Sequence, residues 1–183
     1  MGKFIIFILV AVFSSLSASC AFSAGPAQAE ENGAAADDFS SLFERGKGLK
    51  AKGEYKQAAE YFESALKVSP EGRKEGVRVE LATVLGWSGD YRGAINIFSD
   101  VIRKDPENLD ARMGLAANLS WAKRYDEAID EYKTILGKKP GYTDALLGLA
   151  RTLSWKGEFD EAVDAYNEVL AKDPGNRHAR LGL

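Results

Sequence analysis

Residues 119–128 read LSWAKRYDEA, and residues 153–162 read LSWKGEFDEA. A related segment, LGWSGDYRGA, occupies residues 85–94. The three segments start 34 residues apart, and each joins an apolar stretch that contains a tryptophan to a second stretch that begins with an aromatic residue. A period of this length is typical of proteins built from stacked copies of one small structural unit.

The same period extends through most of the chain and divides it into four units, at residues 39–72, 75–108, 109–142 and 143–176. Two extra residues, near Arg73 and Lys74, lengthen the first junction. Four classes of residue recur once per unit. They are Pro70, Pro106, Pro140 and Pro174; Ala58, Ala94, Ala128 and Ala162; Tyr55, Tyr91, Tyr125 and Phe159; and Phe62, Phe98, Tyr132 and Tyr166.

Each unit is predicted to form two helices, as the third unit illustrates. Residues 109–122 and residues 125–138 both carry apolar side chains at helical spacing. The second stretch begins with two acidic residues and ends with Lys138, an order that suits the helix dipole. Pro140 and Gly141 then end it. No alternating strand pattern lies between the units, so the pattern indicates an all-α fold.

The turn between the two stretches carries a short motif, which is Gly53-Glu54-Tyr55, Gly89-Asp90-Tyr91 and Gly157-Glu158-Phe159 in three of the units. With a small residue inside the first helix and a closing proline, this unit resembles the tetratricopeptide repeat (TPR). The resemblance implies a right-handed superhelical solenoid of helix-turn-helix units. The third unit departs from the motif, with Lys123-Arg124-Tyr125 and no glycine.

A small residue recurs in the first helix of each unit, where it allows the helices to approach closely. These residues are Gly46, Ala82, Ala116 and Ala150. One unit cannot cover its own apolar face, so stacking of neighbouring units supplies the core.

By the same resemblance, one stripe of the first helices lines a concave binding groove. The resemblance places nine residues in this groove: Phe43, Val79, Met113, Leu147, Trp87, Trp121, Trp155, Lys47 and Arg151. Because the stripe is mainly apolar, we expect it to bind an apolar or amphipathic protein segment rather than a terminal carboxylate. The alternative is that the tryptophans seal the joints between units, since either role would repeat with the period.

The N-terminus differs from the repeats. Lys3 precedes an apolar run over residues 4–16, which is too short for a comfortable membrane span. This pattern predicts a secretory signal peptide over residues 1–29 that ends at Ala27-Gln28-Ala29. Cleavage after Ser19-Cys20-Ala21 is the alternative, and an uncleaved anchor is a further interpretation.

Cys20 is the only cysteine of the chain. A lipoprotein signal usually places leucine three residues before its cysteine, where this chain has Ser17. We therefore expect Cys20 to leave with the signal, with lipid attachment as the alternative, and the mature chain to contain no disulfide. Residues 30–38 are polar or small and are predicted to form a flexible tether.

Residues 177–183 read RHARLGL and align with the start of the third and fourth units. They are predicted to begin a fifth unit that is cut short. Because solenoids normally end in a unit with a polar outer face, we expect the chain to be a fragment of a longer protein, or its end to be covered by another subunit.

Several classes of function lack the residues they need. His178 is the only histidine, and with one cysteine it cannot build a metal cluster or a Cys-His pair. Phosphate-binding glycine loops and dinucleotide motifs are absent, and the carboxylates cluster at helix starts. The net charge of −3 lacks the basic excess of a nucleic-acid-binding protein. We expect no catalysis, no cofactor and no metal.

The triplets Leu119-Ser120-Trp121 and Leu153-Ser154-Trp155 resemble repeats of periplasmic TPR segments that precede an outer-membrane β-barrel in bacterial envelope proteins. The resemblance implies an exported, periplasmic scaffold for protein–protein interaction, free or associated with the outer membrane. It also leaves two alternatives: a segment that guides a polysaccharide during export, and a structural spacer.

Overall fold

The computed structural model describes residues 38–183, so the expected signal peptide and all but the last residue of the expected tether lie outside the described residues. Within residues 38–183 all regular structure is helical, which confirms the predicted all-α class. Each helix in this range is too short or too polar to cross a membrane.

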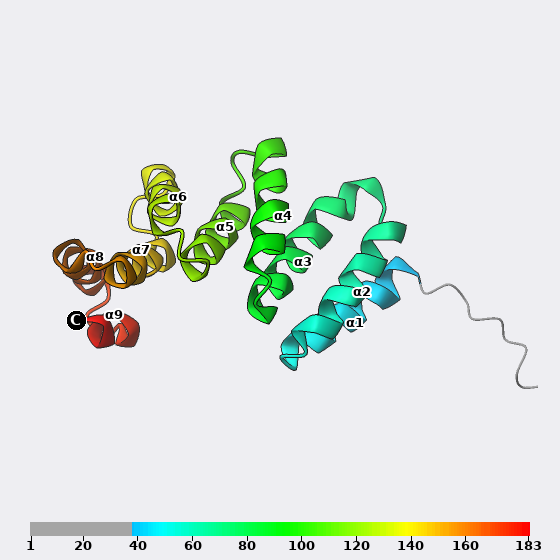
Figure 1. Cartoon of the computed structure of the whole chain (residues 1–183), viewed down its shortest axis with the longest axis horizontal. Helices are drawn as coiled ribbons and strands as arrows, with labels where there is room; N and C mark the ends of the chain where they lie inside the picture. Colours follow the sequence, from blue (N-terminus) through cyan, green and yellow to red (C-terminus); the bar gives the residue numbers. More distant parts are fainter. Residues whose placement is uncertain (1–37) are drawn as a thin grey trace, which may run out of the picture. The chain divides into compact units, whose positions relative to one another are not determined.

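Each expected unit corresponds to two helices, the first helix of the second unit beginning one residue before the expected bound, and consecutive helices pack against one another along the chain (Figure 1). In the third unit both predicted helices are confirmed, and the first ends one residue earlier than expected. In chain order the elements are α1 (Phe39–Ala51), α2 (Tyr55–Val68), the 3-10 helix η1 (Glu71–Arg73), α3 (Lys74–Ser88), α4 (Tyr91–Lys104), α5 (Leu109–Trp121), α6 (Tyr125–Lys138), α7 (Thr143–Lys156), α8 (Phe159–Lys172) and α9 (Arg177–Gly182).

The turn inside each unit requires a left-handed backbone conformation. Gly53, Gly89 and Gly157 adopt it with φ of 79°, 94° and 95°. Glycine reaches this conformation at little cost because it has no Cβ. Lys123 occupies the same place in the third unit with φ of 62°, so the missing glycine changes the residue and not the path of the chain.

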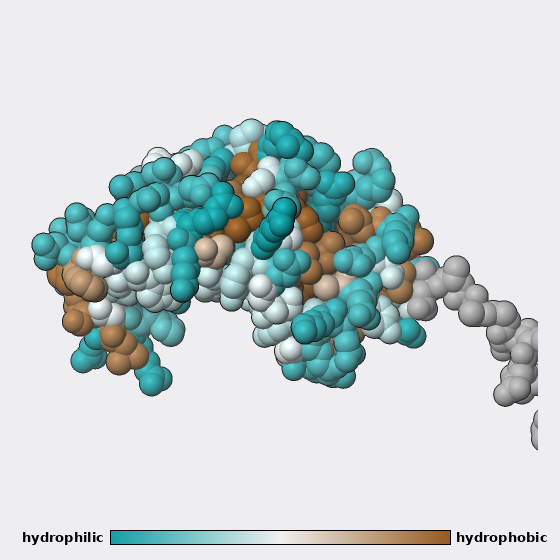
Figure 2. Space-filling model, in the orientation of Figure 1, coloured by the Kyte–Doolittle hydropathy of each residue, from teal (hydrophilic) through white to brown (hydrophobic). Residues whose placement is uncertain are grey.

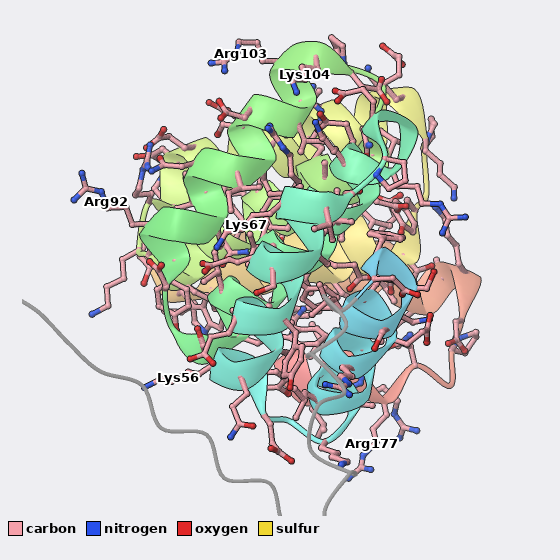
Figure 3. The ribbon with its side chains drawn as sticks, turned by 90° about the vertical axis from the view of Figure 1, so that its right-hand side faces the viewer. Lys56, Lys67, Arg92, Arg103, Lys104 and Arg177 are labelled. Carbon is pink, nitrogen blue, oxygen red and sulfur yellow. The ribbon has the colours of Figure 1, made fainter. Side chains whose placement is uncertain are left out.

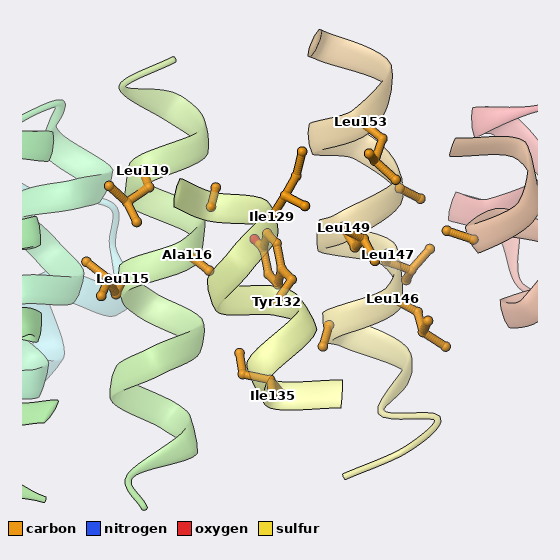
Figure 4. Packing of buried hydrophobic residues seen from close by; sticks show 14 of the residues in the cluster. Leu115, Ala116, Leu119, Ile129, Tyr132, Ile135, Leu146, Leu147, Leu149 and Leu153 are labelled. Atoms are coloured by element: carbon orange, nitrogen blue, oxygen red, sulfur yellow. The ribbon is translucent and has the colours of Figure 1, made fainter. Parts of the chain in front are cut away.

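Contacts between neighbouring units depend on close packing of an aromatic ring against a glycine. A Cβ atom at Gly114 would lie 2.3 Å from the ring of Phe98, and one at Gly148 would lie 2.4 Å from the ring of Tyr132. Figure 4 shows Tyr132 between α5 and α7. The aromatic ring of one unit therefore occupies the space that a larger side chain on the next unit would need.

The buried side chains form two clusters rather than one. The N-terminal cluster contains Phe62 and reaches Val77, Leu81 and Val84 on α3. The C-terminal cluster begins at Ala82 on the same helix and continues through α4 to α9. Two partly buried residues pack against both clusters, namely Leu85 and Ile97.

Candidate protein-binding face

The three tryptophans lie at or near the ends of α3, α5 and α7. Their side chains are 46%, 38% and 50% exposed for Trp87, Trp121 and Trp155. Large aromatic side chains are highly buried on average, so three half-exposed indoles at one repeated position form a distinctive surface. We call these three residues the indole row.

Trp87 and Trp121 also contact the preceding unit. The ring centroids of Tyr55 and Trp87 lie 5.2 Å apart, and those of Tyr91 and Trp121 lie 5.9 Å apart, both in tilted arrangements. The Lys50 ammonium lies 5.4 Å from the centre of the Trp87 ring. One part of each of these indoles therefore packs against the joint, and another part is open to solvent. The arrangement combines features of a seal between units and of a binding surface.

Two cavities open beside the indole row. One of about 320 Å³ is lined by Tyr55, Gly86, Trp87, Tyr91 and Trp121. The other, of about 20 Å³, lies between Trp121 and Trp155 next to Arg151 and has room for one water molecule. Surface depressions thus accompany the exposed indoles at two successive joints.

Buried hydroxyl groups form the base of the smaller cavity. The Ser120 and Thr152 hydroxyl oxygens lie 2.7 Å apart, and each also lies within hydrogen-bond distance of a backbone carbonyl of its own helix. Burial of the Tyr132 phenol raises the pKa of Tyr132, and a side-chain hydrogen bond with Ser120 opposes this shift. This buried network fixes α7 against α5 and α6 directly beneath the two indoles.

The remaining expected groove residues differ in exposure. Phe43 is partly buried and stacks on Phe39, with ring centroids 5.5 Å apart. Lys47 is exposed and forms an ion pair with Glu44.

In the second and third units, Val79 and Met113 pack against the C-terminal cluster and are partly buried. Leu147 belongs to that cluster and is only 8% exposed. Arg151 is exposed, and its Nε donates to the Leu147 carbonyl. The solvent-facing part of the stripe therefore consists mainly of the indole row with Lys47 and Arg151.

A third cavity, of about 620 Å³, lies between α6, α7 and α8 and was not expected from the sequence. Its apolar base consists of Ile129, Leu149, Leu153 and Ala165. Its polar rim consists of Asp126, Asp130, Lys133, Lys156, Glu158, Glu161 and Asp164. We call the base and the rim together the acidic groove.

The sequence contains a signal for the acidic groove, which was missed because the carboxylates were attributed to helix starts. Ala165 stands 34 residues after Glu131, so a small residue replaces a long one at the same place in the unit. Asp130 and Asp164 lie in the second turn of their helices, beyond the first turn where the dipole favours acids. Residues 38–183 contain no cluster of potential metal ligands.

Family comparisons agree with the repeat geometry. The tetratricopeptide repeat family matches residues 39–71, 88–136 and 122–183. The chain belongs to the tetratricopeptide repeat family. Members of the TPR family are protein-interaction modules, and their stacked units present extended binding surfaces.

Solved TPR structures share this fold at low sequence identity. YrrB, described as "a TPR protein with an unusual peptide-binding site", superposes with a TM-score of 0.69 at 20% identity, covering 80% of this chain and 75% of YrrB. MamA from Desulfovibrio magneticus RS-1 gives a TM-score of 0.67 at 18% identity, covering 76% of this chain and 78% of MamA. These likenesses confirm the TPR solenoid. No curated protein matches the sequence.

Proposed function

We propose that this TPR protein is an exported scaffold that binds an apolar or amphipathic segment of a partner protein along the indole row. The observation that carries the proposal is the half-exposure of Trp87, Trp121 and Trp155 at successive units. Tryptophan is enriched among the residues that dominate binding energy at protein interfaces. The peptide-binding site of YrrB, which has the same fold, supports a peptide as the ligand.

The cavities beside the indoles indicate how a segment would lie. An apolar side chain fits the cavity between Trp87 and Trp121, where Tyr55 and Tyr91 supply further aromatic walls. Farther along, the Arg151 guanidinium beside Trp155 offers charged donors to a carboxylate or a backbone carbonyl. A segment with an apolar anchor followed by an acidic residue is complementary to this row.

Export is the second part of the proposal. It is supported by the charged start, the short apolar run and the Ala27-Gln28-Ala29 motif of the sequence. N-terminal sequencing of the protein from its native cells tests export directly. A mature chain that starts at Glu30 in the periplasmic fraction supports it, and a chain that retains Met1 in the cytosol contradicts it.

The binding experiment uses a peptide selected on the wild-type protein from a displayed library. We expect Trp121→Ala to weaken its binding on the order of thirtyfold or more, the effect of losing a dominant interface residue. Phe159→Ala is the matched control, because Phe159 is an exposed aromatic outside the indole row. Normal binding by folded Trp87→Ala, Trp121→Ala and Trp155→Ala variants would exclude the indole row as the site.

A carbohydrate is the second candidate ligand for the same face. The exposed indole faces of Trp121 and Trp155 flank polar groups, an arrangement that suits stacking on a sugar ring with hydrogen bonds at its edge. Titration with neutral and acidic glucans, followed by tryptophan fluorescence, tests this candidate. An unchanged spectrum at millimolar sugar would leave the peptide as the ligand.

A further inference from the structure

We propose that the acidic groove is a second docking site, which binds a cationic amphipathic segment of a partner protein. This inference goes beyond the indole row, because it concerns other residues, another face of α7 and a ligand of defined charge.

The size and base of the acidic groove fit an apolar side chain. Its volume of about 620 Å³ lies within the range of ligand sites in proteins, roughly 300–1,000 Å³. Leu149 and Leu153 come from α7, and Ile129 and Ala165 come from the helices on either side. Figure 4 shows Ile129 on α6 and Leu149 and Leu153 on the neighbouring α7. Apolar side chains that enter the groove would therefore meet an apolar surface.

The rim carries an excess of negative charge. Five carboxylates face two lysines, which gives a net charge of −3 for the rim. Lys156 forms ion pairs with Asp126 and Glu158, at 2.5 and 2.7 Å, and these neighbours raise the pKa of Lys156. The carboxylates of Asp130, Glu161 and Asp164 form no ion pair within residues 38–183, so they remain available to cations of a partner.

The preceding pair of units provides an internal comparison. Positions 34 residues before Asp126 and Glu158 hold Arg92 and Arg124, so the corresponding rim has mixed charge. Figure 3 shows Arg92 extending outward from α4. At the place of Ala165 this pair has Glu131, which forms an ion pair with Arg112 at 2.5 Å. The open volume and the acidic rim thus occur together in the last two units.

The acidic groove and the indole row use opposite faces of α7. Successive residues of a helix are rotated by about 100°, so Leu149 and Leu153 point away from Arg151 and Trp155. The two sites share no lining residue. A ligand can occupy one site while the other is filled, and variants of one site leave the other intact.

The test measures fluorescence anisotropy of a labelled amphipathic peptide made of leucine and lysine, added to the full mature chain. Its counterpart contains glutamate in place of lysine. We expect the leucine–lysine peptide to bind, its affinity to fall as salt is added, and the leucine–glutamate peptide not to bind. Failure of the leucine–lysine peptide to bind, or equal binding of the two peptides, would overturn the proposal.

Two charge variants separate docking in the groove from general attraction to an acidic protein. The triple variant Asp130→Asn, Glu161→Gln, Asp164→Asn removes the unpaired rim charges. The matched control is Glu54→Gln, Glu60→Gln, Glu63→Gln, which changes the net charge equally at exposed carboxylates near and on α2. We expect the rim variant to weaken binding at least about tenfold and the control to leave it within about twofold. Equal losses in both variants would contradict a local site.

A shape variant tests the apolar base without any change of charge. Ala165→Leu places a larger side chain into the groove and is expected to weaken binding of the leucine–lysine peptide at least about tenfold. Circular dichroism checks its fold, and the rim variant keeps the test decisive if Ala165→Leu unfolds. Trp121→Ala should bind the peptide normally, and a loss there would place the peptide on the indole row instead.

Discussion

The first joint, between the first and second units, differs from the later joints in how the two neighbouring units pack. At the later joints an aromatic ring of one unit packs against a glycine of the next, as Phe98 does against Gly114. The corresponding place at the first joint holds Glu80, which forms an ion pair with Lys50 at 2.6 Å. The first joint also contains the extra turn η1, which separates α2 from α3.

The core is divided within the second unit, on α3, and not at the first joint. A ring that packs into a glycine position joins two units tightly, and the C-terminal cluster runs without a break through the joints that have this contact. The N-terminal cluster crosses the first joint without this contact, through Val77, Leu81 and Val84 on α3, and the two clusters meet on that helix. In a stack held by contacts between neighbours, cooperativity is expected to be weakest where the two clusters meet.

The largest expected effect comes from emptying the N-terminal cluster. Phe62→Ala removes a fully buried ring and should cost about 3–5 kcal/mol locally. Because the clusters are separate, we expect amide protection to be lost in α1 to α3 and kept in α5 to α8. Native-state hydrogen exchange measures this. A uniform loss of protection along the chain would show that the two clusters unfold as one.

The next effect compares the two kinds of joint at one position. Gly114→Ala forces a Cβ against the buried Phe98 ring and should destabilise the protein by about 1–3 kcal/mol. Glu80→Ala loses only a partly exposed ion pair and should cost less than about 1 kcal/mol. Urea denaturation of both variants gives the two values.

Gly76→Ala serves as the control for helix propensity at these positions. Gly76 is helical, and its added Cβ would meet nothing within 4 Å, so the change should stabilise the protein by up to about 1 kcal/mol. If Gly114→Ala were also neutral or stabilising, the ring–glycine contact would not explain the difference between the joints.

A smaller effect concerns the turn of the third unit. Lys123 holds a left-handed conformation, which costs a residue with a side chain about 1–2 kcal/mol, and Lys123→Gly removes this cost. Part of the gain is lost again, because glycine loses more conformational entropy on folding. We expect a net stabilisation of about 0.5–1 kcal/mol, with added protection in α5 to α8 only. The reverse change, Gly89→Ala, should destabilise the protein, and thermal melts of both variants measure the pair.

The smallest effect is a pH dependence at the first joint. A hydrogen bond from Lys74 lowers the pKa of Glu71 in η1 below its usual 4.5. Because the pKa of Glu71 is lower in the folded protein, its carboxylate stabilises the fold above pH 4.5. This stabilisation is lost as the pH falls through the lowered pKa of the folded state. Hydrogen exchange of α2 and α3 should show this loss in the wild type and a weaker one in Glu71→Gln.

The fold was predictable because four residue classes share one period, and two of these classes, the alanines and the aromatics of the second helices, are buried in every unit. Phe98 and Tyr132 are buried where the period places them, and α6 has the predicted bounds. The left-handed turn at Lys123 was not predictable from composition, since its conformation is imposed by the helices on either side.

The binding face was predictable only in part. The period identifies the tryptophans, but their exposure depends on how much of each ring the neighbouring tyrosine covers, as at Trp87 and Tyr55. Leu147 is nearly buried although Met113, one unit earlier, is less so, because burial depends on the neighbours of each unit. The acidic groove was missed because it arises from one small residue, Ala165, and carboxylates on three successive elements.

The ring–glycine contacts also bear on how such an array could grow. Residues 109–142 present a glycine, Gly114, to the unit before them and a ring, Tyr132, to the unit after them. A tandem copy of this segment would therefore find complementary neighbours on both sides. The first unit offers no equivalent, because its following joint is built around Glu80 and an added turn. Lengthening by internal duplication is structurally permitted in the later part of the array, whereas the first unit lacks this complementarity at its following joint.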